Sequence, residues 1–174
     1  FAKMTEFTPD WRPAMSDAEQ IDYEDLTDMR LDDAALAELL DAGGECVFNW
    51  TTKDGHPVGV VVAFVYHDGK FFTTCAERRK RVPALRTRPQ SGIVINNAGK
   101  TATFKGESIV HAHGDDKFDE LKQWFYAKLS RVDEQPDDEY RQSFNKFLDS
   151  PHRVIIETDA RLVVAFDTAK FHSF

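Results

Sequence analysis

Residues 55–66 read Gly-His-Pro-Val-Gly-Val-Val-Val-Ala-Phe-Val-Tyr, and this stretch decides the fold class. Its apolar side chains occupy both faces of a predicted strand. One face carries Val58, Val60, Val62 and Phe64, and the other carries Val61, Ala63 and Val65. A strand with one solvent-exposed face would alternate apolar and polar residues, so we expect both faces of this strand to be covered. We expect one face to fill a barrel and the other to lie against a ligand or a second subunit.

Turn residues around this strand separate further short strands. The sequence predicts strands at 46–52, 70–75, 90–97 and 101–112, and two short strand candidates at 154–157 and 162–166. The turns between them are rich in Gly and Asp. Strands and helices do not alternate regularly, so a small closed antiparallel barrel of six strands is favoured over a doubly wound sheet. The predicted fold is mainly β with peripheral helices.

Apolar residues at helical spacing predict the peripheral helices. The first begins at an aspartate cap at 32–33 and ends at the glycine pair 43–44. A short helix lies within 81–89, with one proline early in it and one marking its end. Two longer helices are predicted over 116–132 and over 140–148.

Length and composition favour one domain. The chain has 174 residues, of which 41% are hydrophobic, and its net charge is −8. Such acidity argues against nucleic acid or an anionic membrane as the main partner. We expect an acidic N-terminal arm over 1–30 and a domain over 31–174, with residues 1–3 ahead of Met4 a remnant of cloning.

The sequence carries no sign of export. No apolar run approaches the ~20 residues of a membrane-spanning helix, and no secretion signal is evident. The two cysteines, Cys46 and Cys75, do not make a disulfide framework for a domain of this size. We therefore expect a cytoplasmic protein.

The basic run 78–81, Arg-Arg-Lys-Arg, is the main candidate binding feature. It stands at the start of the predicted short helix and follows the hydroxyls of Thr73 and Thr74. Free backbone donors at a helix start and nearby cations both favour a phosphate. The alternative is a solvated basic face, or one paired with the chain's own carboxylates.

Three other features have ordinary interpretations. His111-Ala112-His113 resembles a metal cluster, but a polar strand end running into a helix cap accounts for it better. Cys75 has no nearby His to activate it, so we expect a structural role. Residues 124–126, Trp-Phe-Tyr, are expected in the core or a subunit contact, with stacking on a cofactor ring as the alternative.

Several of these segments recur in one order in a known family. They are 58–66, Phe71-Phe72-Thr73-Thr74, Arg79-Lys80-Arg81, Leu85, Pro89, 91–95, 101–106, 153–157 and Phe166-Asp167. Over roughly residues 34–170 this order resembles the flavin-binding split β-barrel family, to which pyridoxamine 5'-phosphate oxidase belongs. The resemblance implies a six-stranded antiparallel split β-barrel.

The resemblance also implies a cofactor site. Alignment on Leu85 and Pro89 puts Lys80 and Arg81 where the family binds phosphate, and Thr74 where its phosphate-facing Thr stands. The flavin ring would lie along the backbone of 60–62, and Thr101 falls where the oxidase carries a flavin-contacting Gln. The implied cofactor-binding residues are Val60, Val61, Val62, Thr73, Thr74, Arg79, Lys80, Arg81 and Thr101.

Departures from the family pattern argue against vitamin B6 chemistry. Gly59 and Phe64 stand where the authentic oxidases carry an Arg and a Lys, and their C-terminal Trp and Arg-rich motif is absent from 161–174. The resemblance then implies a flavin-dependent oxidoreductase that binds FMN at a homodimer interface, with its substrate open. The alternatives are an oxidoreductase that uses the deazaflavin coenzyme, and a flavin or haem carrier without turnover.

Overall fold

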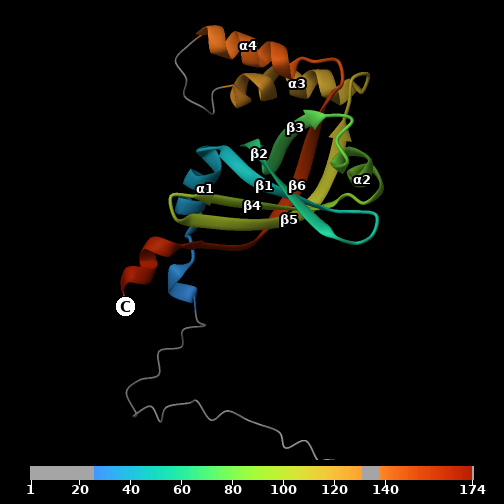
Figure 1. The fold of residues 1–174 in the computed structure, drawn as a ribbon. Helices are drawn as coiled ribbons and strands as arrows, with labels where there is room; N and C mark the ends of the chain where they lie inside the picture. The colour runs from blue at the N-terminus through green and yellow to red at the C-terminus, as the bar shows by residue number, and fades with distance from the viewer. Residues whose placement is uncertain (1–25, 131–137, 174) are drawn as a thin grey trace, which may run out of the picture.

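The structure, a computed structural model, describes residues 26–130 and 138–173. Six antiparallel strands form a closed barrel in the order β1-β2-β3-β6-β5-β4, with β4 returning to β1 (Figure 1). The strands are β1 (Gly44–Thr51), β2 (Pro57–His67), β3 (Lys70–Ala76), β4 (Gln90–Asn97), β5 (Lys100–His111) and β6 (Arg153–Asp167). The predicted mainly β, six-stranded antiparallel barrel is confirmed.

The prediction of two short strands at the end of the chain is wrong. Residues 153–167 form one strand, because the polar segment between its apolar halves stays paired with β5. Ala160 pairs with Gly106 there, and a Cβ on Gly106 would lie 2.0 Å from the backbone oxygen of Asp159. Only glycine allows so close an approach. Local sequence pattern does not reveal such a cross-strand pairing.

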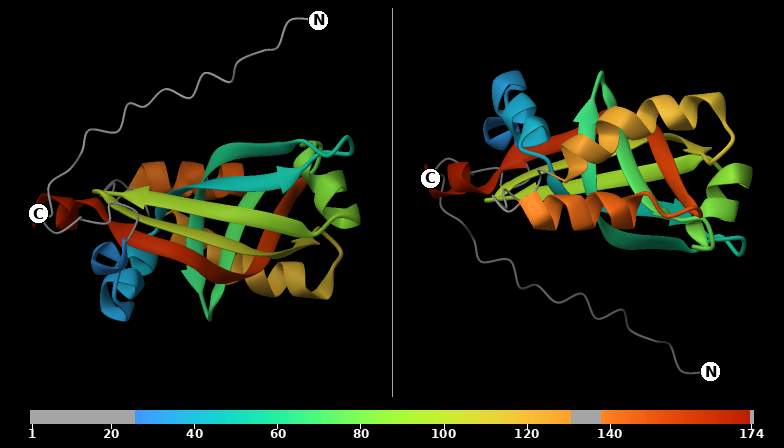
Figure 2. Two further views of the ribbon diagram at one scale, coloured as in Figure 1. Left: turned by 90° about the horizontal axis from the view of Figure 1, so that it is seen from below. Right: turned by 90° about the horizontal axis from the view of Figure 1, so that it is seen from above.

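In the described part of the chain, four α-helices pack around the barrel (Figures 1 and 2). They are α1 (Asp33–Asp41), α2 (Arg81–Thr87), α3 (Asp116–Leu129) and α4 (Asp138–Leu148), with short 3-10 helices η1 (Thr27–Met29) and η2 (Thr168–Ser173). The predicted cap of α1 is confirmed, because the carboxylate of Asp32 accepts from the backbone N–H of Ala35 at 2.8 Å. Gly43, at φ 65°, follows the end of this helix.

Two apolar clusters hold the fold together. The first fills the barrel, where the side chains of Phe48, Phe64, Phe71 and Ile93 are fully buried. The second lies between α3, α4 and the outer surface of β2, β3 and β6. Its members are Val65, Phe72, Phe118, Leu121, Phe125, Tyr126, Leu129, Leu148 and Ile155. Phe125 and Tyr126 are therefore core residues, as predicted.

The two faces of β2 have different surroundings. Phe64 points into the barrel, as expected for one face. The other face was expected to meet a ligand or a second subunit, but α3 and α4 cover it at Val65. Farther along the same face Val61 is 58% exposed. The chain thus covers Ala63 and Val65 on this face itself and leaves Val61 open.

The end of the predicted N-terminal arm lies against the last strand. Met29 is buried, Arg30 bridges to Phe166, and the backbone N–H of Leu31 donates to the oxygen of Ala165 at 3.1 Å. Residues 1–25 of that arm lie outside the described residues. In the described part of the chain, no helix combines the length and apolarity needed to cross a membrane.

Candidate functional site

The four cations of the basic run have different surroundings. Lys80 lines a groove beside α2, whereas Arg78 lines a second groove with His152. Arg79 is exposed, and Arg81 is buried beside Cys75. Since α2 has only seven residues, its N-terminal dipole adds little, and an anion here would depend on the side chains.

Three cationic residues are among those that line the groove beside α2. The groove has a volume of about 470 Å³ and lies between α2 and the end of the β1–β2 hairpin. Its lining residues are Trp50, Thr52, Lys53, Lys80, Pro83, Ala84, Thr87 and Arg88. Within the described residues no carboxylate lines it, but the surface it offers is mainly apolar, and the hydroxyls of Thr52 and Thr87 are already hydrogen-bonded. Three cationic side chains thus border a largely apolar surface that includes the indole of Trp50. Such a surface suits a ligand with an aromatic part and an anionic group at its edge.

The two threonines of β3 point to opposite sides of the strand. Thr73 is 2% exposed and turns its side chain into the barrel, so it does not face a ligand at the surface. Thr74 is half-buried and donates its hydroxyl to the backbone oxygen of Val154 at 2.8 Å. Of the two predicted hydroxyls, only that of Thr74 lies on the side of α3 and α4.

A second buried arginine lies at this end of β3. Arg153, the first residue of β6, pairs with Ala76 and sits above the ring of Phe147 at 4.4 Å. Burial lowers its pKa. Sequence analysis placed Arg153 only within a strand, because nothing local shows that it meets the basic run.

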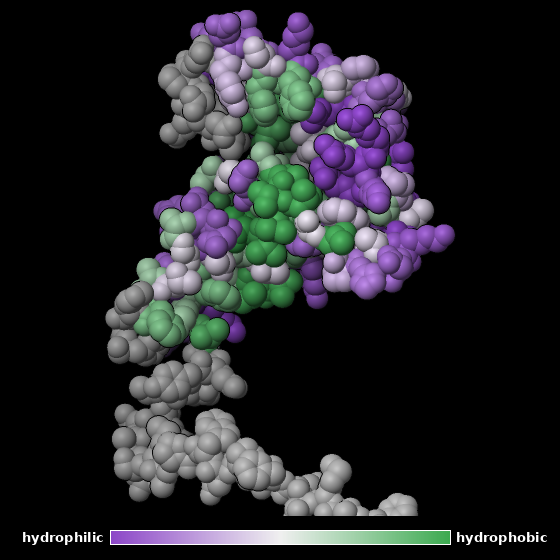
Figure 3. All heavy atoms as spheres, in the orientation of Figure 1, coloured by the Kyte–Doolittle hydropathy of each residue, from purple (hydrophilic) through white to green (hydrophobic). Residues whose placement is uncertain are grey.

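The predicted flavin surface on β2 is partly open. Val60 and Val62 pack against the barrel core, and Val61 points outward. Val61 belongs to an apolar row that crosses five neighbouring strands in register. The row is Val61, Val47, Val94, Thr103 and Val164. Figure 3 shows apolar surface on the barrel below α3 and α4.

Thr101 is not brought to the basic run within one chain. It pairs with Asn96 beside the turn at 98–99, at the end of the β4–β5 hairpin that lies away from α2. Gly59 is exposed on the outer face of β2, while Phe64 is fully buried in the barrel. The Phe64 position therefore presents no side chain to a substrate.

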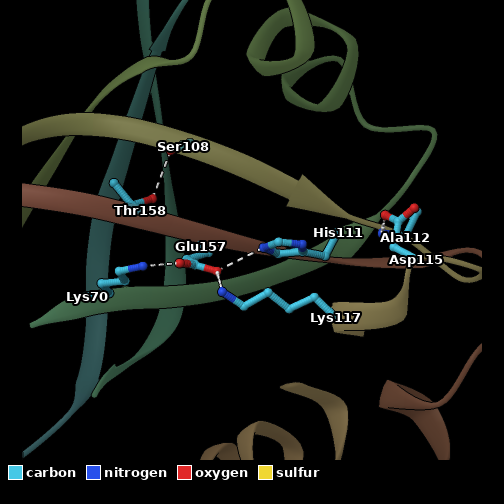
Figure 4. Close-up of polar contacts among 8 residues, drawn as sticks. All are labelled: Lys70, Ser108, His111, Ala112, Asp115, Lys117, Glu157 and Thr158. Atoms are coloured by element: carbon cyan, nitrogen blue, oxygen red, sulfur yellow. Dashed lines mark hydrogen bonds and ion pairs between the residues drawn. The ribbon is translucent and has the colours of Figure 1, made fainter. Parts of the chain in front are cut away.

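A buried carboxylate forms a separate polar cluster, shown in Figure 4. Glu157 is 2% exposed and accepts from Lys70, from Nε2 of His111 at 2.9 Å and from Nζ of Lys117 at 3.2 Å. Burial raises the pKa of Glu157, but these hydrogen bonds lower it more, so the pKa falls from 4.5 to about 2. The hydrogen bond to Glu157 raises the pKa of Lys70.

A chain of hydroxyls continues inside the barrel. Ser108 lies 2.7 Å from Ser91 and 2.8 Å from Thr158, oxygen to oxygen, and all three are buried. The three hydroxyls satisfy one another's hydrogen-bonding capacity, as buried polar groups usually do. Neither this row of hydroxyls nor the Glu157 cluster can be predicted from local sequence, because each joins strands that are far apart in the sequence.

The two histidines and Cys75 have separate surroundings. His111 and His113 do not share a site: His111 bonds Glu157, and His113 stacks near Phe118. No group of three metal-ligating residues occurs among the residues that the structure describes. Burial raises the pKa of Cys75 despite Arg81 and Arg153 nearby, which fits a structural cysteine.

Comparison with solved structures identifies the fold. HutZ, the haem storage protein of Vibrio cholerae, matches with a TM-score of 0.59 at 14% identity over 80% of this chain and 98% of its own. An F420 reductase matches with a TM-score of 0.52 at 17% identity, over 74% of this chain and 93% of its own. A pyridoxamine 5'-phosphate oxidase-related, FMN-binding protein of Nostoc punctiforme matches with a TM-score of 0.52 at 13% identity, over 73% of this chain and 78% of its own.

This chain has the split β-barrel fold of the pyridoxamine 5'-phosphate oxidase-like proteins. Proteins with this fold include FMN-binding proteins, an F420 reductase and a haem storage protein, so the fold alone leaves the function open. No protein-family model matches the chain, and no curated protein matches it. The function must be argued from the chain's own residues.

Proposed function

We propose that this split β-barrel protein is an oxidoreductase that binds FMN at a homodimer interface, with the deazaflavin coenzyme as the alternative cofactor. The observation that carries the proposal is the concentration of cations around α2 in a chain of net charge −8. Lys53, Lys80 and Arg88 line one groove, and Arg81 is buried close by. Cations gathered against the overall charge indicate a site for an anion.

The residues present fit a phosphorylated flavin. Lys80 and Arg81 would hold its phosphate by charge-assisted hydrogen bonds, with Arg79 next to them in the chain, and Thr74 would join them if its hydroxyl left the oxygen of Val154. When bound, the isoalloxazine would supply the electron or hydride transfer. The protein's part is to bind and orient the cofactor, and the groove beside α2 adds Trp50 as an aromatic surface.

The exposed valine row supports the homodimer. Four valines and one threonine cross the outer surface of the barrel in register, and Val61 is 58% exposed. Apolar surface gathered in this way marks an interaction site. A second copy would bury it, with an interface above roughly 1,000 Å².

Val61→Lys tests the dimer, with Ile109→Lys as its control. Both residues are 58% exposed and lie on outer strand surfaces, but only Val61 belongs to the row. We expect Val61→Lys to convert the dimer to a monomer in sedimentation at micromolar concentration, and Ile109→Lys to stay dimeric. A wild-type monomer under these conditions would refute the dimer.

The spectrum of the purified protein separates the candidate functions. Oxidised flavin, deazaflavin and haem absorb differently, and reduction of the bound cofactor by NADPH or by the reduced deazaflavin coenzyme distinguishes an enzyme from a carrier. We expect a flavin or deazaflavin spectrum and reduction by one of these donors. A haem spectrum without reduction would favour a carrier.

The phosphate ligands are tested by the double variant Lys80→Ala/Arg81→Met. Methionine replaces Arg81 because that side chain is buried rather than on the surface. Each lost charge-assisted hydrogen bond is worth roughly 1.5–3 kcal/mol, so affinity for FMN should fall by about two orders of magnitude. Lys146→Ala, an exposed cation on α4, should leave it unchanged. Equal affinities for FMN in wild type and both variants would refute the phosphate site at Lys80 and Arg81.

Pyridoxamine 5'-phosphate should not be a substrate. Gly59 has no side chain, and Phe64 is enclosed in the barrel, so neither position offers a cation for the substrate phosphate. We expect negligible oxidation in an assay with added FMN. Robust turnover would show that other residues recognise this substrate.

A further inference from the structure

The groove beside α2 combines an apolar surface with a cationic border. Trp50 and Pro83 contribute to its apolar surface. Its cations come from three places: Lys53 from the turn between β1 and β2, Lys80 from the residue before α2, and Arg88 from the residue after it. The volume of about 470 Å³ lies in the usual range of small-molecule sites.

The three cations of this groove have no carboxylate partner. In the ranges 26–130 and 138–173, no ion pair includes Lys53, Lys80 or Arg88. Asp54, which follows Lys53 in the chain, accepts a hydrogen bond from the hydroxyl of Thr52 instead. An anionic group at the edge of the groove would therefore meet cations that the described residues leave uncompensated.

Hydrogen bonds hold the walls of the groove in place. The Nε of half-buried Arg88 donates to the backbone oxygen of Thr51 at 3.4 Å, which ties the end of α2 to β1. In the hairpin turn, the backbone N–H of Thr52 donates to the oxygen of His56 at 2.9 Å. Nε is the one donor of Arg88 with a hydrogen bond among the described residues, so its terminal nitrogens are left for a ligand. The groove is thus preformed, which lowers the entropic cost of binding.

The groove is separate from most of the residues proposed for the cofactor. Val61 lies on the outer surface of β2, Thr74 lies on the side of α3 and α4, and Arg81 is buried. Of the residues proposed for the cofactor, only Lys80 lines the groove. The groove therefore offers a surface for a second ligand.

We propose that the groove beside α2 binds an aromatic carboxylate, and that this class contains the substrate of the oxidoreductase. The aromatic ring would lie against Trp50 and Pro83, and Lys53 and Arg88 would bind the carboxylate, which the planar fork of an arginine matches. A sugar or a nucleotide suits the groove less well, because its hydroxyls would find few polar partners on a mainly apolar surface. Binding of the carboxylate stands by itself, whereas its role as substrate rests on the proposed function.

The first experiment compares indole-3-acetate with its neutral analogue indole-3-acetamide by isothermal titration calorimetry. The two compounds share the ring and differ in charge, so the ratio of their affinities reports on the cations. We expect wild type to bind the acetate about tenfold more tightly, and Arg88→Met to lose most of this preference while it binds the acetamide as before. Equal affinities of wild type for the two compounds, or no binding of the acetate, overturn the proposal.

Three further variants keep this test decisive. Arg86→Met is the matched control, since Arg86 is also on α2 but pairs with Glu77 at 3.0 Å, and it should keep the wild-type preference. Trp50→Leu should weaken binding of both compounds about tenfold and leave their ratio unchanged. Lys53→Met serves if Arg88→Met does not fold, and its preference should fall about threefold. An equal loss of preference in Arg86→Met and Arg88→Met, or full binding by Trp50→Leu, contradicts the proposal.

The second experiment separates this ligand from the cofactor. Indole-3-acetate is titrated into wild type with and without saturating FMN, and FMN binding is measured by its own fluorescence. We expect both to bind at once, so the affinity for indole-3-acetate should not fall when FMN is bound. Displacement of indole-3-acetate by FMN would assign the groove to the cofactor and overturn the proposal. If neither FMN nor the deazaflavin coenzyme binds while indole-3-acetate still does, the proposed function fails and the carboxylate site stands.

Discussion

Glu157 and Arg153 lie four residues apart on one face of β6, and their surroundings are opposite. Glu157 is a buried anion with three donors, Lys70, His111 and Lys117 (Figure 4). Arg153 is a buried cation with an orphan Nε and another arginine as its charged neighbour. A compensated buried charge contributes to stability, whereas an uncompensated one lowers it. One strand thus carries both kinds of buried charge.

Replacement of Glu157 should have the largest effect. Glu157→Ala leaves Lys70, His111 and Lys117 without their carboxylate, and loss of one partner from a buried pair costs 3–5 kcal/mol. Because both lysines are partly exposed, we expect the free energy of unfolding to fall by about 3 kcal/mol, measured in urea. Glu107→Ala on β5, an exposed carboxylate, should change it by less than about 0.5 kcal/mol. Equal losses in the two variants would contradict the special role of Glu157.

Acid should weaken the same cluster. The pKa of Glu157 is about 2 in the folded protein against 4.5 for the ordinary group. A lowered pKa means that its stabilisation is present above pH 4.5 and is lost as the pH falls toward 2. Unfolding of wild type from pH 6 to 2 should therefore show a loss of roughly 3 kcal/mol that Glu157→Gln lacks. Parallel curves for the two proteins would show that other carboxylates account for the acid sensitivity.

Lys117→Met should have a smaller effect. Lys117 is half-exposed, and Lys70 and His111 continue to compensate Glu157 without it. We expect a loss of about 1 kcal/mol in urea unfolding. A loss as large as that of Glu157→Ala would mean that Lys117 alone compensates the carboxylate.

Replacement of Arg153 should have the smallest effect on stability. In chloride buffer without phosphate, Arg153→Met removes an unpaired buried charge and also its contact with Phe147. These two effects oppose one another, so the free energy of unfolding should stay within about 1 kcal/mol of wild type. A loss of about 3 kcal/mol would show that Arg153 is compensated within the protein, like Glu157.

Local pattern predicted the parts of the site that are close in sequence. The basic run, the strand ending at Thr74 and the short helix follow from residues within about ten positions of each other. The surroundings of each cation do not follow from the pattern. Lys80 and Arg81 are adjacent in the chain, yet one lines an open groove and the other is buried beside Cys75.

The sequence by itself determined the barrel, because alternation of side chains along a strand and the placement of turns are local properties. It also determined the helix cap at Asp32 and the apolar faces of α1, α3 and α4. Only the tertiary structure decided that β6 continues as one strand, that Glu157 has three donors and that Arg153 lies near Arg79 of the basic run. These depend on strand register and helix packing, which bring together residues up to about 90 positions apart.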